Sequence, residues 1–210
     1  FMNTETGVEL RKADVLLEDN EIHSNLKTGV FITDRSKCKI VGNKIIKNNG
    51  NGVEITEDSD PLIAGNAIAG NMGAGIHICK TFKGCITGND ISENLLQGIS
   101  VKMCTALGLV IKENNIHHCN NSGILVYKGG LAQLEGNHVH HCKKSGIEIR
   151  NLQTRVILLK NVISECAAFG IYAHDTSVVT MQENEATENV FDNLRVESHA
   201  TVQLIERNVF

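Results

Sequence analysis

Runs of four or five residues in which hydrophobic and polar positions alternate follow one another along the entire chain. Successive side chains of a β-strand point to opposite sides, so each run is typical of a short strand with one buried face. Glycine and asparagine, which favour turns, separate the runs. The runs are too short for helices, and no helical spacing of apolar residues continues across them. The pattern predicts an all-β chain.

The runs recur in phase about every 23 residues. The main run of each unit opens at Gly7, Gly29, Gly52, Gly75, Gly98, Gly123, Gly146, Gly170 and Asn193. A second column stands four residues earlier, at Asn3, Asn25, Asn48, Asn71, Asn94, Cys119, Cys142, Cys166 and Asn189. A third column consists of Asn20, Asn43, Asn66, Asn89, Asn114, Asn137, Asn161, Asn184 and Asn208. Agreement in three columns establishes an internal repeat.

One short strand cannot bury its apolar face alone, so the repeats must stack on one another. About 23 residues suffice for three short strands and three turns, which make one coil of a parallel β-helix. We therefore predict a single-stranded, right-handed parallel β-helix of about nine coils, forming one domain over residues 1–210. Asparagines at the same turn of successive coils can form an amide ladder, in which Cys119, Cys142 and Cys166 are small, buried replacements.

Neither end of the chain carries the atypical segment with which solenoids usually close an open stack. The sequence begins at the Asn3 position of the repeat and stops shortly after Asn208. We therefore expect flanking coils or capping domains in a longer chain, of which residues 1–210 are an excised part.

The composition narrows the classes of partner. Lys and Arg number 20 and Asp and Glu 24, and the resulting net charge of −4 does not suit a nucleic-acid partner. No apolar run approaches the roughly 18 residues of a membrane span, so no membrane partner is expected. Seven scattered Cys and the lack of a signal segment favour an intracellular location, cytoplasmic or nuclear. With 2 Tyr, 6 Phe and no Trp, few rings are on offer for sugar binding.

The second and fourth residues after each column glycine are expected to point outward and to form one long exposed face. On coils six to eight this face carries a predicted partner-binding patch of Tyr127, Glu148, Arg150, Tyr172 and His174. Arg and Tyr are the side chains that most often anchor protein interfaces, although exposed strands also select Tyr for its β-propensity. A secondary patch consists of Glu54, His77, Cys79 and Lys102.

The same face lacks the carboxylate pair of a glycoside hydrolase. Hydrolysis needs two carboxyl groups about 5–9.5 Å apart, whereas Glu54 and Glu148 stand four coils apart and Phe31 separates Glu9 from Glu54. We therefore predict no catalytic residue and favour a chain that is not an enzyme. An acidic turn is interpreted as a solvated surface, with a weak calcium site as the alternative, and consists of Asp34, Glu57, Asp58 and Asp60.

Histidines and cysteines coincide on two successive coils. His117 and His140 share one column, His118 and His141 the next, and Cys119 and Cys142 follow them. Paired His and Cys on adjacent coils could approach zinc-ligand geometry. Because the cysteines occupy the ladder column, we expect them to face the interior, and we expect His117 and His140 to stack on the surface. The sequence therefore predicts neither a metal site nor a cofactor.

The residue pattern of the repeats resembles that of the PbH1-type (CASH) β-helix repeats over essentially the whole chain. Examples are Asn114-Asn-Ile-His-His-Cys119 and Ser145-Gly-Ile-Glu-Ile149. These repeats occur in pectin-degrading enzymes, periplasmic copper-site maturation proteins and eukaryotic scaffolds. The style is most similar to that of the intracellular eukaryotic group, which includes F-box-only ubiquitin-ligase receptors and the SHC-binding protein of the midzone. That resemblance implies recognition of a ubiquitin-ligase substrate, although no F-box lies within these residues.

Two functions from different classes remain open. The first is a non-enzymatic, protein-binding β-helix, the recognition part of an intracellular scaffold or ubiquitin-ligase receptor. The alternative is a carbohydrate-active β-helix enzyme, a polysaccharide lyase, hydrolase or epimerase, in which Glu54, His77 and Lys102 would form a proton-transfer group. A structural spacer without a specific ligand is a third interpretation.

The predicted strand register can be tested by substituting an inward-facing residue. In Ile147→Asp an unpaired carboxylate is buried in the stack, which we expect to reduce the free energy of unfolding by several kcal/mol, of the order known for buried unpaired charges. Chemical denaturation monitored by circular dichroism measures this loss. A stability close to that of the original chain would show that the assigned register is wrong.

Overall fold

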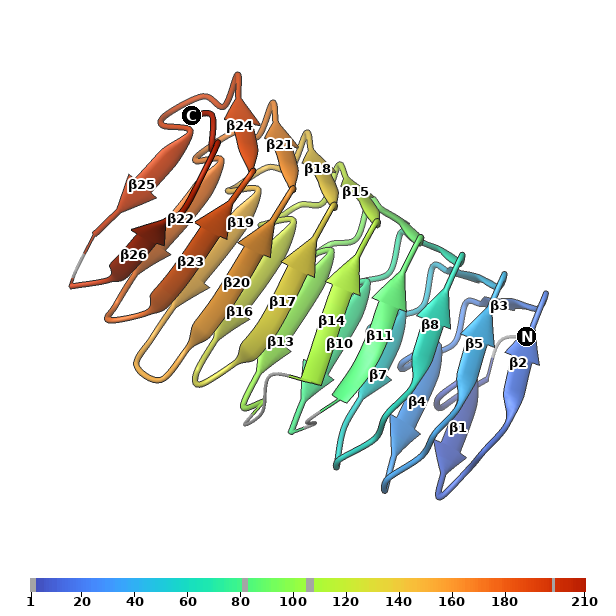
Figure 1. Ribbon diagram of the computed structural model, residues 1–210. Helices are drawn as coiled ribbons and strands as arrows, with labels where there is room; N and C mark the ends of the chain where they lie inside the picture. The colour runs from blue at the N-terminus through green and yellow to red at the C-terminus, as the bar shows by residue number, and fades with distance from the viewer. Residues whose placement is uncertain (1–2, 81–82, 105–107, 198) are drawn as a thin grey trace.

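The computed structural model describes residues 3–80, 83–104, 108–197 and 199–210. The chain winds into a parallel β-solenoid whose coils follow one another from the N-terminal to the C-terminal end (Figure 1). Successive strands join three different sheets, here named A, B and C. The described residues contain no helix, and so none that is long and apolar enough to cross a membrane. The prediction of an all-β parallel β-helix is confirmed.

Sheet A consists of β1 (Val8–Arg11), β4 (Val30–Thr33), β7 (Val53–Ile55), β10 (Ile76–Cys79), β13 (Ile99–Lys102), β16 (Ile124–Tyr127), β19 (Ile147–Arg150), β22 (Ile171–His174) and β25 (Leu194–Val196). Sheet B consists of β2 (Leu16–Glu18), β5 (Lys39–Val41), β8 (Leu62–Ala64), β11 (Lys83–Thr87), β14 (Gly108–Lys112), β17 (Leu131–Glu135), β20 (Arg155–Leu159), β23 (Val178–Gln182) and β26 (Thr201–Leu204). Sheet C consists of β3 (Glu21–His23), β6 (Lys44–Ile46), β9 (Ala67–Ala69), β12 (Asp90–Ser92), β15 (Asn115–His117), β18 (His138–His140), β21 (Val162–Ser164) and β24 (Glu185–Thr187).

Sheet C therefore has eight strands where sheets A and B have nine. An isolated parallel bridge between Glu185 and Val209 continues sheet C beyond its last strand. The stack consequently makes about eight complete turns, a little fewer than the nine coils counted from the column residues.

The core is a set of columns of stacked aliphatic side chains. In sheet A, Ile124 lies in register with Ile99 on one side and with Ile147 on the other, and all three are fully buried. Each such side chain contributes about 1.5–3 kcal/mol through burial. The burial of Ile147 and Ile149 confirms that the first and third residues after each column glycine point inward.

The outward-facing positions of sheet A are less exposed than expected. Ser100 and Leu125, in the second position, and Thr33 and Cys79, in the fourth, are all buried. Coils stack about 4.8 Å apart, so a short side chain is shielded by longer neighbours in its column. Ser100, for example, lies in register with His77 and Leu125. The face is thus a partly covered surface rather than a uniformly exposed one.

Asparagine side chains connect the coils at the corner between sheets B and C. The backbone N–H and the Nδ2 group of Asn66 both donate to Oδ1 of Asn89, each at 2.9 Å, and Nδ2 also donates to the carbonyl oxygens of Ile40 and Ala64. The same pattern links the column from Asn20 to Asn208. We call this column the long ladder, and it confirms the predicted amide ladder.

A second ladder, which we call the short ladder, follows the corner between sheets C and A. It is amide-linked from Asn3 to Asn94. From there Cys119, Cys142 and Cys166 continue the column; they are buried and unpaired as disulfides, and their Sγ atoms face the carbonyl oxygens two residues earlier. The predicted interior position of these cysteines is confirmed.

From Asn20 onward, each ladder residue follows a residue with left-handed backbone geometry. Before the long ladder φ lies between 53° and 65°, and before the short ladder between 52° and 65°. Glycine takes this conformation without strain, as at Gly88, but Glu113, His118 and His141 occupy equivalent positions. Because residues of different types adopt this conformation, it is a property of the coil rather than of one side chain. It also fixes the direction of the side chain just before the left-handed residue.

The long ladder can be tested with Asn89→Ala. This change deletes Oδ1 of Asn89, which accepts two hydrogen bonds from Asn66. It also deletes Nδ2 of Asn89, which donates to oxygen atoms of Ile63, Thr87 and Asn114, so buried groups are left unsatisfied. We expect a loss of roughly 2–4 kcal/mol in unfolding free energy, from one to three kcal/mol for each unsatisfied buried group. Urea denaturation is the measurement, and Asn49→Ala, at an exposed site, is the matched control. Equal midpoints for the two variants would contradict a structural role for the ladder.

Candidate functional site

Five residues on three neighbouring strands of sheet A form one cluster. They are Tyr127 of β16, Glu148 and Arg150 of β19, and Tyr172 and His174 of β22. Arg150 lies in register with Tyr127 on one side and His174 on the other, and Glu148 lies in register with Tyr172. The structure thus brings together all five residues of the patch that the sequence singled out, and we call them the β16–β22 cluster.

Glu148 is the centre of this cluster. Its Oε1 atom lies 3.6 Å from Nε of Arg150 and 3.5 Å from Nε2 of His174, and its Oε2 atom accepts a hydrogen bond of 2.7 Å from Oγ of Ser122. The side chains of Glu148 and His174 are only 14% and 13% exposed, whereas Arg150 is 40% exposed. A shielded carboxylate is therefore held between a cation and an imidazole.

Two nitrogen atoms of the cluster are buried without a hydrogen bond within the described part of the chain. They are Nε of Arg150 and Nε2 of His174. Buried polar atoms without a partner are rare in native proteins and cost free energy. Both atoms face Oε1 of Glu148, just beyond hydrogen-bond distance.

Asp175 determines the orientation of the His174 ring. Its Oδ2 atom lies 3.2 Å from Nδ1 of His174 and accepts a long hydrogen bond of 3.4 Å from Nδ2 of Asn151. A carboxylate beside Nδ1 favours a proton on that nitrogen. Nε2 on the other side of the ring faces Oε1 of Glu148 at the longer distance of 3.5 Å. An imidazole held in this way is suited to act as a general base.

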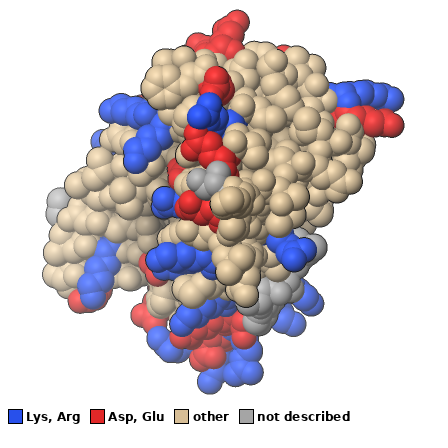
Figure 2. Space-filling view, turned by 90° about the vertical axis from the view of Figure 1, so that its left-hand side faces the viewer, with Lys and Arg blue, Asp and Glu red and all other residues tan. Residues whose placement is uncertain are grey.

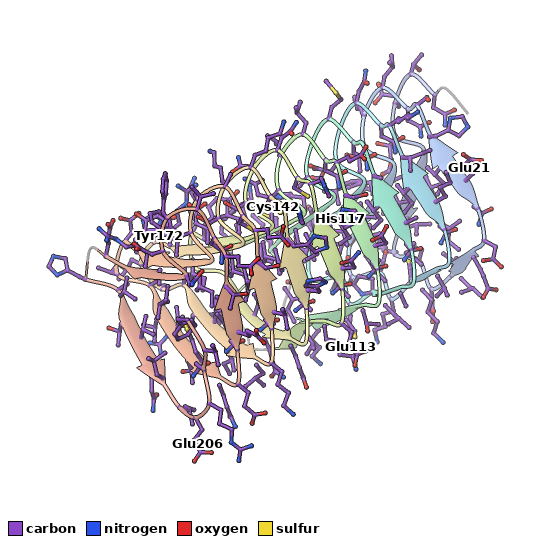
Figure 3. The ribbon with its side chains drawn as sticks, turned by 90° about the horizontal axis from the view of Figure 1, so that it is seen from above. Glu21, Glu113, His117, Cys142, Tyr172 and Glu206 are labelled. Atoms are coloured by element: carbon purple, nitrogen blue, oxygen red, sulfur yellow. The ribbon has the colours of Figure 1, made fainter. Side chains whose placement is uncertain are left out.

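Aromatic rings continue from the cluster toward the C-terminal coils. Tyr172 stacks on His174 with ring centroids 4.2 Å apart, Phe169 lies 4.7 Å from Tyr172, and Phe191 lies 5.5 Å from Phe169. We call these four rings the aromatic row; Figure 3 labels Tyr172 in the C-terminal half of the solenoid. The sequence analysis missed Phe169 and Phe191. Their position in the turn just before the column residues Gly170 and Asn193 is the signal that could have revealed them.

The hydroxyl of Tyr172 donates a hydrogen bond of 2.9 Å to Oε2 of Glu197. Burial raises the pKa of Tyr172, and the bond to Glu197 raises it further. The phenol consequently keeps its proton at neutral pH.

On the other side of the cluster, the guanidinium of Arg150 and the ammonium of Lys128 stand over the ring of Tyr127, at 5.7 and 5.9 Å from its centroid.

The secondary patch is also assembled, except for its cysteine. Glu54 lies in register with His77, and Cys79 with Lys102. Burial, followed by the charge of Lys102, lowers the pKa of His77. Cys79 is only 8% exposed, so it lies beneath the surface and is not available for contact with a partner. Its longer neighbour Lys102 shields it.

The acidic turn is engaged with protein groups rather than converging on one point. Asp34 pairs with Nζ of Lys12 at 3.4 Å, and Oε2 of Glu57 accepts a hydrogen bond from Oγ1 of Thr33 at 2.9 Å. Across the ranges that the structure describes, no three His, Cys, Asp or Glu side chains are arranged as the ligands of a closed metal site. The turn therefore offers no ready calcium cage.

Five histidines of sheet C and its following turn lie together on coils five and six. His117 stacks on His140 at 5.1 Å and His118 on His141 at 5.0 Å, and His138 packs against His140 at 4.4 Å. The predicted surface stacking of His117 and His140 is confirmed, and His118 and His141 stack in the same way. Burial, followed by the neighbouring histidines, lowers the pKa of His140 to about 4. We call these five residues the histidine ladder; Figure 3 labels His117 near the middle of the solenoid.

The pKa of His140 predicts a pH-dependent stability. The pKa of His140 is about 4 in the folded chain, whereas an ordinary histidine, as in the unfolded chain, has a pKa of 6.5. The unfolded chain therefore binds the proton first as the pH falls. The stabilisation is fully present above pH 6.5 and is lost between pH 6.5 and 4. We expect the thermal midpoint of the original chain to fall more steeply across this window than that of His140→Ser, which copies the equivalent Ser92 and Ser164. Parallel pH profiles would show that His140 is not responsible.

A family model described as a right-handed β-helix region matches residues 3–158 and 83–210. No curated protein matches the chain in sequence. Among solved structures, a mutant of the periplasmic alginate epimerase AlgG superposes with a TM-score of 0.84 at 21% identity, over 94% of this chain and 50% of that chain. The A-module of the mannuronan C-5 epimerase AlgE4 from Azotobacter vinelandii gives 0.63 at 14% identity, over 92% and 58%. Pectate lyase Pel9A gives 0.54 at 10% identity, over 99% and 69%.

At these identities the likeness concerns the fold. The chain spans about half the length of the alginate epimerase structures. These neighbours are carbohydrate-active enzymes and not F-box proteins, so the comparisons support the β-helix repeat that the sequence resembles and add no support for the F-box group.

Proposed function

The chain belongs to the right-handed β-helix family, and we propose that it is a carbohydrate-active member that binds an acidic polysaccharide across the β16–β22 cluster. The observation that carries this proposal is His174. Its Nδ1 atom is held by Asp175, and its shielded Nε2 atom makes no hydrogen bond and lies beside the same carboxylate as Arg150. The names of the structural neighbours, alginate and mannuronan epimerase and pectate lyase, agree with an acidic sugar polymer.

The aromatic row and Arg150 supply the two kinds of contact that such a polymer requires. Flat rings bury the apolar faces of sugars, and the row extends from His174 to Phe191. A guanidinium pairs with carboxylates with high geometric specificity. The scarcity of aromatic residues in the composition is thus offset by their collection at one place.

Epimerisation and elimination of a uronate both begin with removal of the proton on the carbon that bears the carboxylate. In this proposal Arg150 stabilises the negative charge that develops on the carboxylate. His174 accepts the proton at Nε2. The hydroxyl of Tyr172 returns a proton to the sugar, exchanging its hydrogen bond to Glu197 for one to the substrate. Hydrolysis fits less well, because Glu148 and Asp175 are each occupied by protein groups and do not form a free acid pair.

Deuterium exchange tests the proposed proton abstraction. The chain is incubated in heavy water with polymannuronate or polygalacturonate, and with a neutral glucan as the comparison. Nuclear magnetic resonance then measures deuterium on the carbon beside the carboxylate. We expect incorporation with an acidic polymer only, and about 10²–10⁴ times less for His174→Gln, the usual range for loss of a general base.

The matched control is His77→Gln, another histidine of sheet A. If this variant, alone or with Glu54→Ala, abolishes exchange while His174→Gln does not, the secondary patch is the site. If no acidic polymer binds or exchanges, the proposed function is wrong.

A protein-binding function is the second candidate, favoured by exposed apolar residues beside the cluster. Phe191 and Val190 are 65% and 67% exposed, and Phe191 packs against Phe169. Figure 2 shows the molecule with its C-terminal coils toward the viewer, and residues other than Lys, Arg, Asp and Glu cover much of this face. Aromatic residues next to an Arg are typical of interface centres. An intracellular scaffold, including a ubiquitin-ligase receptor, belongs to this second candidate.

A capture experiment distinguishes the two candidates. Protein partners retained by the original chain and lost by Tyr127→Ala with Arg150→Ala, in the absence of any effect of added acidic polymer, would favour protein binding. Release of the same partners by the polymer would indicate that both use the β16–β22 cluster.

A further inference from the structure

We propose that the histidine ladder binds a divalent transition-metal ion such as Zn²⁺ through the paired Nδ1 atoms of consecutive histidines. The ladder lies on sheet C and its turn, whereas the β16–β22 cluster lies on sheet A, so this inference does not depend on the proposed function. In each of the two coils the Nδ1 atoms of neighbouring histidines lie 2.8 Å apart, His117 facing His118 and His140 facing His141.

The outer nitrogens of three of these rings face oxygen atoms. Nε2 of His117 lies 3.2 Å from Oδ1 of Asp90, and Nε2 of His141 lies 3.0 Å from Oε2 of Glu165. Nε2 of His140 lies 3.2 Å from Oδ1 of Asn115. The amide orientation of Asn115 is set by its own Nδ2, which donates to Asp90 at 2.8 Å. All three Nε2 atoms therefore carry the proton and donate it.

This assignment leaves the lone pairs of His140 and His141 on their Nδ1 atoms, pointing at each other. Two lone pairs 2.8 Å apart repel unless a proton or a metal ion lies at them. A divalent cation that accepts both lone pairs satisfies the pair.

The surroundings match those of metal-bound imidazoles. Ligating histidines usually donate their other N–H to a carboxylate or carbonyl oxygen, which orients the ring. Asp90, Asn115 and Glu165 take this part here. The carboxylates of Asp90 and Glu165 also add negative charge close to the pairs.

The fold brings the two nitrogens of each pair together. His117 and His140 end the strands β15 and β18, and His118 and His141 follow in the left-handed conformation shared by all coils at this turn. At the same position of the first coil, Nδ1 of His23 faces Oγ of Ser24 at 3.2 Å. A strand-end residue and its turn neighbour therefore meet in each of these coils, and a chelating pair arises where both are histidine.

The pair also limits the type of ion and its affinity. Within the described ranges no three ligating side chains converge, so water must complete the coordination. Neutral imidazole suits Zn²⁺, Cu²⁺ and Ni²⁺, whereas Mg²⁺ and Ca²⁺ prefer oxygen ligands. The cysteines of the short ladder are not ligands, because they are buried inside the coil.

Isothermal titration of the purified chain with Zn²⁺ alone tests this proposal, with Mg²⁺ as the comparison. We expect saturable binding of Zn²⁺ and none of Mg²⁺. His140→Ser combined with His141→Gln should weaken Zn²⁺ binding at least about tenfold, while His23→Ser, in the same column, should leave it unchanged. Glu165→Gln, which retains every proposed ligand, should also weaken binding and serves if the double variant does not fold.

Nuclear magnetic resonance of the imidazole nitrogens identifies the ligating atoms. Shifts on adding Zn²⁺ that centre on the Nδ1 atoms of the histidine ladder support the proposal. Absence of saturable binding, shifts at Nε2, or equal losses in the His23 and His140–His141 variants would overturn it.

Discussion

The structure depends on one constraint, the in-register parallel pairing of each coil with the next. Backbone hydrogen bonds supply part of it. The long and short ladders supply the rest through side-chain amides, most of them buried, as at Asn66, and through the buried cysteines that continue the short ladder. Since equivalent residues must lie directly above one another, every position of the repeat becomes a column. The aliphatic core, the β16–β22 cluster and the histidine ladder are all consequences of this stacking.

The sequence predicts the columns well because a repeat that keeps three columns in phase specifies both the strands and their register. The inward position of Ile147, the amide bonds of Asn89 and the burial of Cys119 all follow from it. The repeat does not specify how far a side chain stands above its neighbours, so the burial of Leu125 and Cys79 was not predicted. The repeat also does not specify the direction in which a turn residue points its side chain. For this reason the contact of Phe169 with Tyr172, in the aromatic row, was not predicted.

A rigid stack holds chemically different groups on separate sheets at fixed distances. The rings of the histidine ladder repeat at 5.0–5.1 Å, close to the spacing of strands in a sheet, because each ring belongs to one coil. The β16–β22 cluster likewise obtains Tyr127, Arg150 and His174 from three successive coils. Functional groups built on strands are positioned more accurately than groups on loops. Both clusters are therefore assembled from ordinary coils of the solenoid, without an additional structural element.

The two ladders have a consequence for how such a chain can change its length. Each long-ladder asparagine that is followed by a short-ladder position precedes it by five residues, and each column glycine lies four residues further along, without exception. From a column residue to the next long-ladder asparagine the interval varies from 13 to 16 residues. In the earlier coils this variation falls at the corner between sheets A and B. In the last coil the extra residue follows sheet B, because Leu204, four residues before Asn208, pairs with Met181, three residues before Asn184. Where the structure describes it, the corner between sheets A and B has no asparagine ladder. Evolution can lengthen the coil there, next to the ends of the strands that carry the β16–β22 cluster, without disturbing the axis of the solenoid.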